Sequence, residues 1–220
     1  MSKRARPPKL HGLYHQYLVD QDTAAFNQSV SSYYTVGTLE RLAVVGDRMA
    51  RRAAVLALGQ CGDYGSNASL GRALQDDDRG VRMLAENGIR QLWCRTGTRL
   101  QRKQLEAIIA LNAAQRHDEA LEQATKLIHS APSLAECWNQ RALARFSIGR
   151  FRESIEDCHQ ALEINPYHFG AATGMGQCHL QLHDRAAALE CFRRALKLNP
   201  NLEGVRAHVL YLQRTLKSQE

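Results

Sequence analysis

Three prolines, Pro132, Pro166 and Pro200, recur at equal intervals of thirty-four positions, with small and apolar residues in register ahead of each one. A fixed period of this length with self-similar apolar positions predicts a solenoid, in which helix-turn-helix units bury their apolar faces against their neighbours. We therefore expect function on a surface and not in a catalytic cleft. The segments that superpose without a gap are 101–134, 135–168 and 169–202.

Each period has room for two amphipathic helices. In the second period, residues 135–148 show helical spacing of apolar positions, Gly149 and Arg150 turn the chain, and residues 151–164 show the same spacing again. After the last proline, apolar residues recur at three- and four-residue steps within a polar segment, which predicts a capping helix over 203–217.

The whole chain is expected to be all-α. Strand signals are scarce, because no Asn-Gly or Asp-Gly pair lies between alternating apolar runs. A hydrophobic fraction of 44% is enough for a continuous core, and 6% aromatic residues suit interfaces built from Ala and Leu. We predict a right-handed α-solenoid of stacked helical hairpins.

The periodic segment resembles the tetratricopeptide repeat family. The residues that match the family pattern are Trp138, Met175, Gly176, Ala188, Phe192, Ala195 and the three prolines Pro132, Pro166 and Pro200. Leu111, Arg145 and His179 replace the family's core tyrosine, and the first segment lacks the aromatic and Leu-Gly positions. The resemblance implies three tetratricopeptide repeats over 101–202, in which Trp138, Gly176 and the prolines are structural.

A second, shorter period precedes residue 100. A shift of thirty-one positions superposes Asp47 on Asp78 and Arg51 on Arg82, each followed by apolar residues at helical steps. This string resembles the HEAT-like repeats of the phycobilisome lyase type, which implies HEAT-like repeats over 13–97. The resemblance implies that the aspartates cap helices and the arginines pair along the stack. An Asp before a helix is also physically suited to cap its free amides.

The positive charge lies in the first half of the chain. Residues 1–103 hold 16 Lys and Arg against 9 Asp and Glu, whereas residues 104–220 hold 13 of each. Residues 1–12 include a basic run beside Pro7 and Pro8, which predicts a flexible arm. Such a basic half could bind an acidic partner, nucleic acid or an anionic membrane, or could be a solubilising tail with structural arginines.

The tetratricopeptide resemblance implies a ligand groove lined by the first helix of each repeat. The residues that it selects as a peptide-binding groove are Asn139, Gln140, Leu143, Phe146, Thr173, Gln177 and Leu180. Their amides can bond a peptide backbone, and the apolar members can hold an anchor side chain. For the amides, plain solvation is the alternative, and for Phe146 and Leu180 it is packing between repeats. We expect a neutral or amphipathic peptide segment as ligand.

Some members of this family hold a chaperone's C-terminal carboxylate with lysine, asparagine and arginine side chains. The residues at those positions here are Leu105, Ile109, Gly170 and Gly174. None of these can clamp a carboxylate through a charged or amide side chain. The resemblance therefore argues against a chaperone tail as ligand.

No catalytic or metal-binding constellation is evident. The six cysteines contain no Cys-x-x-Cys pair and are expected to be buried thiols. Adjacent Cys and His on a helix point about 100° apart, so Cys158-His159 and Cys178-His179 do not form nucleophilic dyads. Nucleotide-binding and hydrolase fingerprints are absent. We expect no enzymatic activity, no metal and no cofactor.

The sequence favours a non-catalytic scaffold or adaptor that binds another protein. Two alternatives stay open: a chromophore-lyase-like or accessory factor acting through the HEAT-like repeats, and a nucleic-acid- or membrane-associated factor acting through the basic half. No apolar run is long enough for a signal peptide or a membrane span, so a cytoplasmic location is expected.

Overall fold

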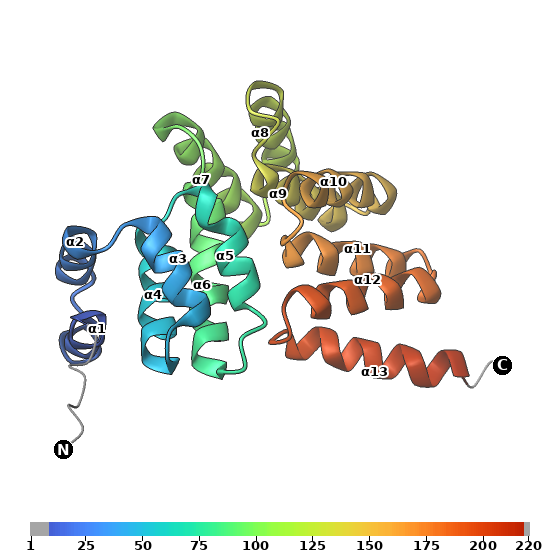
Figure 1. The fold of residues 1–220 in the computed structure, drawn as a ribbon. Coiled ribbons are helices and arrows are strands. Elements are labelled where there is room, and N and C mark those ends of the chain that lie inside the picture. The colour runs from blue at the N-terminus through green and yellow to red at the C-terminus, as the bar shows by residue number, and fades with distance from the viewer. Residues whose placement is uncertain (1–8, 218–220) are drawn as a thin grey trace, which may run out of the picture. The chain divides into compact units, whose positions relative to one another are not determined.

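The computed structural model describes residues 9–217, and every regular element in this range is a helix (Figure 1). The fold is an all-α solenoid, as the sequence predicts. The chain divides into two compact units, Met1–Leu92 and Trp93–Glu220, here called unit 1 and unit 2. The division falls inside one helix, α6, and a few residues before the boundary at 97 expected from the repeats.

Unit 1 contains α1 to α5 and most of α6. Their bounds are α1 Lys9–Asp20, α2 Thr23–Tyr33, α3 Val36–Val45, α4 Arg48–Cys61, a short 3-10 helix Tyr64–Ser66, α5 Asn67–Ala73 and α6 Arg79–Arg95. Residues 9–12, expected as the end of a basic arm, belong to α1. The reason is that Leu10 is fully buried and its N–H donates to the Tyr34 hydroxyl at 2.9 Å. Residues 1–8 of that arm lie outside the described residues.

Aspartate side chains begin α4 and α6. The carboxylates of Asp47 and Asp78 accept the backbone N–H of Ala50 and Val81 at 2.9 and 3.0 Å, which satisfies amides that have no partner within the helix. Arg82 donates to the carbonyl oxygens of the turn that precedes its own helix, at Asp76 and Asp77. The repeated Asp and Arg positions therefore organise helix starts in unit 1.

Arginines of α4 also tie this helix to the turn before α6. Arg51 donates two hydrogen bonds to Asp76 at 2.7 and 2.9 Å, and Arg52 donates two to Asp78 at the same distances. Bidentate pairs of this kind fix orientation as well as adding energy.

Glycines let α4 and α6 approach each other closely. A Cβ built on Gly59 would lie 2.7 Å from the Cα of Gly88, and the reverse distance is the same. Only residues without a side chain fit at this crossing, so the two backbones are in direct contact there.

Unit 2 is a series of helical hairpins that ends in a single helix (Figure 1). The bounds are α7 Arg99–Ala113, α8 His117–Ser130, α9 Ala135–Ser147, α10 Phe151–Ile164, α11 Phe169–Gln181, α12 Arg185–Leu198 and α13 Glu203–Lys217. The second helices of the three hairpins begin at residues 117, 151 and 185, which reproduces the period of the sequence. Helix α13 lies where the capping helix is expected.

The turns inside the three hairpins share an unusual backbone conformation. Gln115, Gly149 and His183 occupy equivalent positions of successive periods and have positive φ angles of 60°, 80° and 61°. A left-handed residue at this point costs little for glycine and more for residues with a Cβ. The period is therefore preserved in backbone geometry even where the residue type changes.

The core of unit 2 is built from small residues and a few rings. A Cβ on Gly176 would lie 2.5 Å from Cε1 of the buried Phe192 ring, so the ring packs directly on the α11 backbone. The Trp138 indole N–H donates to the carbonyl of Pro132 at 2.8 Å, and Arg206 donates to the carbonyl of Pro200 at 2.6 Å. These bonds connect the turn after one hairpin to the next helix.

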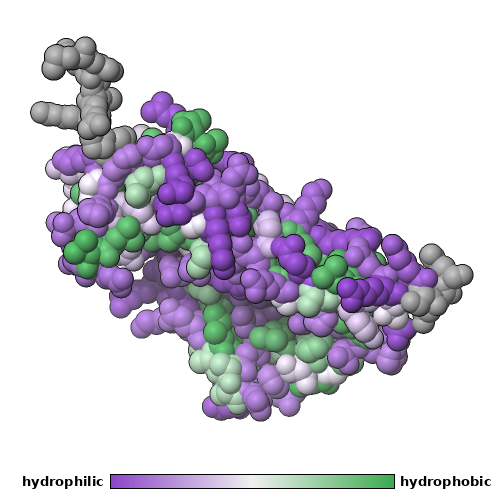
Figure 2. All heavy atoms as spheres, turned by 90° about the horizontal axis from the view of Figure 1, so that it is seen from below, coloured by the Kyte–Doolittle hydropathy of each residue, from purple (hydrophilic) through white to green (hydrophobic). Residues whose placement is uncertain are grey.

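The surface carries mainly hydrophilic residues on the face seen in Figure 2, with hydrophobic residues in separate patches. Within the described range, no helix combines the length and the apolar character that crossing a bilayer requires.

Candidate peptide-binding surface

The predicted groove residues lie on the first helices of two successive hairpins. Asn139, Gln140, Leu143 and Phe146 are on α9, and Thr173, Gln177 and Leu180 are on α11. Leu143 and Gln177 are exposed, and the other five are half-buried. Helices α9 and α11 contact each other, so one surface includes residues from both.

A buried carboxylate organises this surface. Glu136, in the first turn of α9, is only 8% exposed. Its Oε1 accepts hydrogen bonds from Asn139 Nδ2 at 3.1 Å and from Gln140 Nε2 at 2.7 Å. Its Oε2 lies 3.0 Å from Nε2 of His168. Every oxygen of this buried group therefore has a partner, as a buried charge requires.

His168 connects the carboxylate to α11. Its Nδ1 accepts the backbone N–H of Ala171 at 3.1 Å, which caps the start of α11. Because Nδ1 is an acceptor, the ring proton is on Nε2 and is donated to Glu136. Trp93 stacks on the imidazole with ring centroids 4.2 Å apart and planes 15° apart. The ring is thus fixed in tautomer and orientation.

The Glu136 carboxyl stays ionised. Burial opposes its charge and raises its pKa, but the hydrogen bonds from His168, Gln140 and Asn139 outweigh burial and hold the pKa below its ordinary value. The surface therefore contains one fixed negative charge beneath its amides.

Asn112 extends the network to the first hairpin. This α7 residue is 7% exposed, and its Nδ2 donates to the backbone carbonyl and to Oε1 of Gln140 at 2.9 and 3.0 Å. A chain of polar contacts therefore joins α7, α9 and the start of α11.

The network changes what the predicted groove residues can do. The carboxylate can only accept, so the amide nitrogens of Asn139 and Gln140 are turned toward Glu136. Their oxygens remain as acceptors, one of them shared with Asn112. The Gln177 side chain forms no hydrogen bond within the described part of the chain. The amides of Asn139 and Gln140 therefore also stabilise the surface from inside, by hydrogen bonds to Glu136. This role differs from the plain solvation considered in the sequence analysis.

The apolar groove residues divide into two kinds. Leu143 is 45% exposed. Phe146 packs edge-on against Phe151 of α10 with centroids 5.5 Å apart, and Leu180 packs against the core around α11 and α12. The Thr173 hydroxyl donates to the carbonyl of Phe169 at 2.8 Å. Leu143 is therefore the free apolar anchor position, whereas Phe146 and Leu180 also stabilise their own hairpins.

The arginines near this surface are neutralised internally. Arg141 donates to both oxygens of Asp157 at 3.0 and 2.7 Å, and Arg145 lies 2.8 Å from the same carboxylate. Asp157 is on α10 and almost completely buried. These arginines hold α9 on α10 and do not present free positive charge to a ligand.

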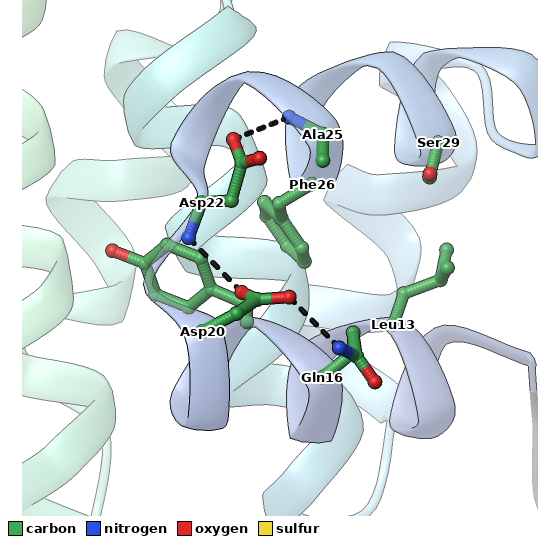
Figure 3. A pocket seen from close by; sticks show the side chains of 8 residues that line it. Leu13, Gln16, Asp20, Asp22, Ala25, Phe26 and Ser29 are labelled. Carbon is green, nitrogen blue, oxygen red and sulfur yellow. Dashed lines mark hydrogen bonds between the residues drawn. The ribbon is translucent and has the colours of Figure 1, made fainter.

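Other places in the described residues do not form a site of this kind. A hollow between α1 and α2 has a volume of about 50 Å³, and Figure 3 shows three hydrogen bonds among the residues that line it. Asp20 accepts from Gln16 and from the Asp22 N–H, and Asp22 accepts from Ala25. Within residues 9–217, no group of three or more metal-ligating side chains is assembled.

Only some of the cysteines are as buried as the sequence predicts. Cys137, Cys158 and Cys178 are buried, but Cys94 and Cys191 are intermediate and Cys61 is exposed. Burial raises the pKa of the Cys137 thiol to about 12 and also raises the pKa of the Cys158 thiol. Buried, protonated thiols are poor nucleophiles.

Two members of the network, Glu136 and His168, were not predicted from the sequence. Glu136 is the second residue of its repeat and His168 is the last residue of the same repeat. The period places both residues at junctions between hairpins, and this position is the signal that could have indicated their proximity.

Comparison with known proteins identifies two of the repeats in unit 2. The tetratricopeptide repeat family model matches residues 135–168 and 171–202. A tetratricopeptide repeat-containing protein of Rhizobium etli is 34% identical over 85 residues, which cover 39% of this chain and 42% of that protein. The DnaJ homolog subfamily C member 7 of Mus musculus is 33% identical over 90 residues, which cover 41% of this chain and 18% of that protein. The chain thus spans less than half the length of these relatives.

Solved structures agree on the fold. The first tetratricopeptide domain of human RPAP3 matches with a TM-score of 0.52 and 23% identity, over 56% of this chain and 96% of that chain. The first such domain of Spaghetti (RPAP3), bound to the HSP90 peptide SRMEEVD, matches with a TM-score of 0.51 and 22% identity, over 53% and 93%.

Proposed function

We propose, from the premise that residues 135–168 and 171–202 are tetratricopeptide repeats, that this chain is a non-catalytic cytoplasmic adaptor that binds a peptide segment of another protein. The observation that supports it most is the surface on α9 and α11. There Leu143 of α9 and Gln177 of α11 are exposed, and Asn139 and Gln140 of α9 bond the buried Glu136. Rigid helices with fixed polar groups and one apolar anchor suit recognition of a short segment.

The polar groups favour a ligand that donates hydrogen bonds. The amide nitrogens of Asn139 and Gln140 serve Glu136, so acceptor oxygens remain for a bound chain. We infer a neutral or amphipathic segment whose backbone N–H groups or side-chain donors meet these oxygens, with an apolar residue against Leu143.

A C-terminal carboxylate is not the ligand that this surface suits. The relative bound to the HSP90 peptide raises that possibility. In this chain the corresponding positions carry Leu105, which is fully buried, together with Ile109, Gly170 and Gly174. The buried Glu136 charge would also oppose a second carboxylate.

For unit 1 we propose a second protein-interaction module of HEAT-like hairpins. The support is the repeated capping aspartates, Asp47 and Asp78, and the bidentate Arg51–Asp76 pair. Its described residues hold nine Lys and Arg and nine Asp and Glu, so the basic surplus of the first half is not spread over this unit. That balance favours a protein partner over nucleic acid for unit 1.

The test of the α9–α11 proposal is selection of ligands from a displayed peptide library on the full chain. Peptides recovered with the wild type should bind Leu143→Lys and Gln177→Lys at least tenfold more weakly, because each change removes a contact and adds a charge. His159→Lys, on an exposed position of α10, is the matched control and should bind like the wild type.

Circular dichroism and thermal unfolding must show that all three variants keep the fold. Peptides that bind the three variants equally, or no selected peptide at all, would reject this surface as the binding site.

A further inference from the structure

The first hairpin of unit 2 has an open face. Helices α7 and α8 line a hollow of about 620 Å³, whose α7 side is formed by Lys103, Gln104, Ala107, Ile108, Ala110 and Leu111, with Ala114 just after the helix. The three alanines are exposed. No residue that lines this hollow belongs to the Glu136 network or to the proposed peptide-binding surface.

The repeat period shows what kind of surface this is. A shift by one period superposes Lys103 on Cys137 and Ala110 on Ala144, both of which are fully buried in the second hairpin. A shift by a second period superposes the same two residues on Ala171 and Cys178 of the third hairpin, which are also fully buried. In those hairpins the preceding second helix supplies the cover, since α8 packs on α9 and α10 packs on α11. Within unit 2 no preceding helix takes this place on α7, so the α7 face is a stacking face that the unit's own helices leave uncovered.

The helices that cover such faces in this chain are acidic. Helix α8 carries three acidic residues against one lysine, and α10 carries four against one arginine. Both are strongly amphipathic, with apolar residues at three- and four-residue steps. A helix that took the same place on α7 would also need to be acidic and amphipathic.

The charge on α7 fits an acidic occupant. Its first turn holds no acidic residue, and Arg99 and Lys103 are exposed without an ion-pair partner among the described residues. Positive charge near a helix N-terminus is unfavourable, because it faces the positive end of the helix dipole. Arg116, also at the hollow, is already paired with Glu119. An acidic helix beside Arg99 and Lys103 would relieve this repulsion.

We propose that an acidic amphipathic helix of another protein packs on α7 and α8 in the way that α8 packs on α9. Charge argues against the chain's own occupants. The N-terminal residues Lys3, Arg4 and Arg6 are basic, and a second copy would offer α13, whose charged residues are mostly basic. A partner helix with acidic residues beside small apolar residues fits both the shape of the hollow and the positive charge of Arg99 and Lys103.

The probe is a helix-stabilised, fluorescein-labelled peptide with the sequence of residues 117–130, added to the full chain and followed by fluorescence anisotropy. We expect saturable binding that Ala110→Arg weakens at least tenfold. Ala113→Arg, also exposed on α7 but outside the hollow, is the matched control and should bind normally. Binding that does not respond to Ala110→Arg would mean that the peptide exchanges into the place of α8 itself, and would overturn the proposal.

A charge exchange makes the test specific. A peptide with its three acidic residues replaced by lysine should lose affinity for the wild type and regain it for the double variant Arg99→Glu, Lys103→Glu. The proposal is overturned if the probe does not bind or if Ala113→Arg weakens it equally. It is also overturned if Ala110→Arg lowers the thermal midpoint by several degrees, because the chain itself would then cover the face. Concentration-dependent dimers that Ala110→Arg abolishes would assign the face to a second copy instead.

Discussion

Both units hold their helices together with pairs of arginine and aspartate, but they bury these pairs to different extents. In unit 1, Arg51 and Arg52 reach aspartates whose side chains are 12% and 11% exposed and which lie in the turn before α6. In unit 2, the Asp157 side chain is 2% exposed and takes two arginines from α9. In unit 1 the Arg–Asp pairs connect α4 to the turn where α6 starts, whereas in unit 2 they form a buried ion pair between α9 and α10.

The difference matters because burial changes the cost of losing a partner. A pair near the surface contributes little, since water replaces the lost bond. Removing one member of a buried pair leaves a charge without compensation and costs several kcal/mol. Unit 2 should therefore be far less tolerant of change at its aspartate than unit 1.

The largest expected effect is on Asp157. Asp157→Ala leaves Arg141 and Arg145 without their anion and should lower the free energy of unfolding by about 3–5 kcal/mol. Asp76→Ala, the matched change in unit 1, should cost about 1 kcal/mol. Urea unfolding followed by circular dichroism measures both, and equal costs would contradict the comparison.

A second contrast uses glycines at close contacts. Gly59→Ala places a Cβ 2.7 Å from the Gly88 backbone, which cannot rotate away, whereas Gly176→Ala meets the Phe192 ring, which can turn. We expect a loss of about 3 kcal/mol for the first and about 1–2 kcal/mol for the second, within the range for overpacking. Thermal unfolding would show the order, and a larger loss for Gly176→Ala would mean that the ring is locked.

The third contrast is the response to acid. The Arg52 hydrogen bonds hold the pKa of Asp78 at about 2, below its ordinary 3.8. Its contribution to stability is therefore present above about pH 4 and is lost as the pH falls toward 2. Asp78→Asn should flatten the pH dependence of unfolding in this window by about 1 kcal/mol, a value reduced by screening from water.

Glu136 gives the counterpart in unit 2, because its pKa is also lowered. Glu136→Gln should weaken unit 2 at neutral pH and remove part of its acid sensitivity below about pH 4.5. An unchanged acid profile in this variant would show that the network is not ionised.

The smallest effect concerns glycines with free space around them. No atom lies within 4 Å of a Cβ on Gly149 or on Gly37, but only Gly149 has a positive φ. Gly149→Ala should cost about 1 kcal/mol because of its left-handed backbone. Gly37→Ala in α3 should instead stabilise by about 0.5 kcal/mol. Calorimetric midpoints would test the opposite signs.

Periodic features of this chain could be predicted from sequence because each depends on local spacing. The prolines, the hairpin lengths and the capping helix follow from one register that repeats through unit 2. The capping roles of Asp47 and Asp78 follow from chemistry within a few residues of each helix start.

The network around Glu136 was harder to predict because its bonds join residues 28 and 32 positions apart. The register places Asn139 and Gln140 on the correct helix, but it does not fix side-chain rotation. Their inward orientation depends on a buried carboxylate that only the three-dimensional packing reveals. The burial of Asp157 was unpredicted for the same reason.

The ring that stacks on His168 also gives the molecule a natural optical reporter. The chain has two tryptophans, Trp93 and Trp138, and both belong to unit 2. Indole emission therefore reports mainly on unit 2, because Trp138 lies within it and Trp93, at the end of α6, stacks on its His168, whereas far-ultraviolet circular dichroism follows the helices of both units. A single titration read at two wavelengths would separate the stabilities of the two units without cutting the chain.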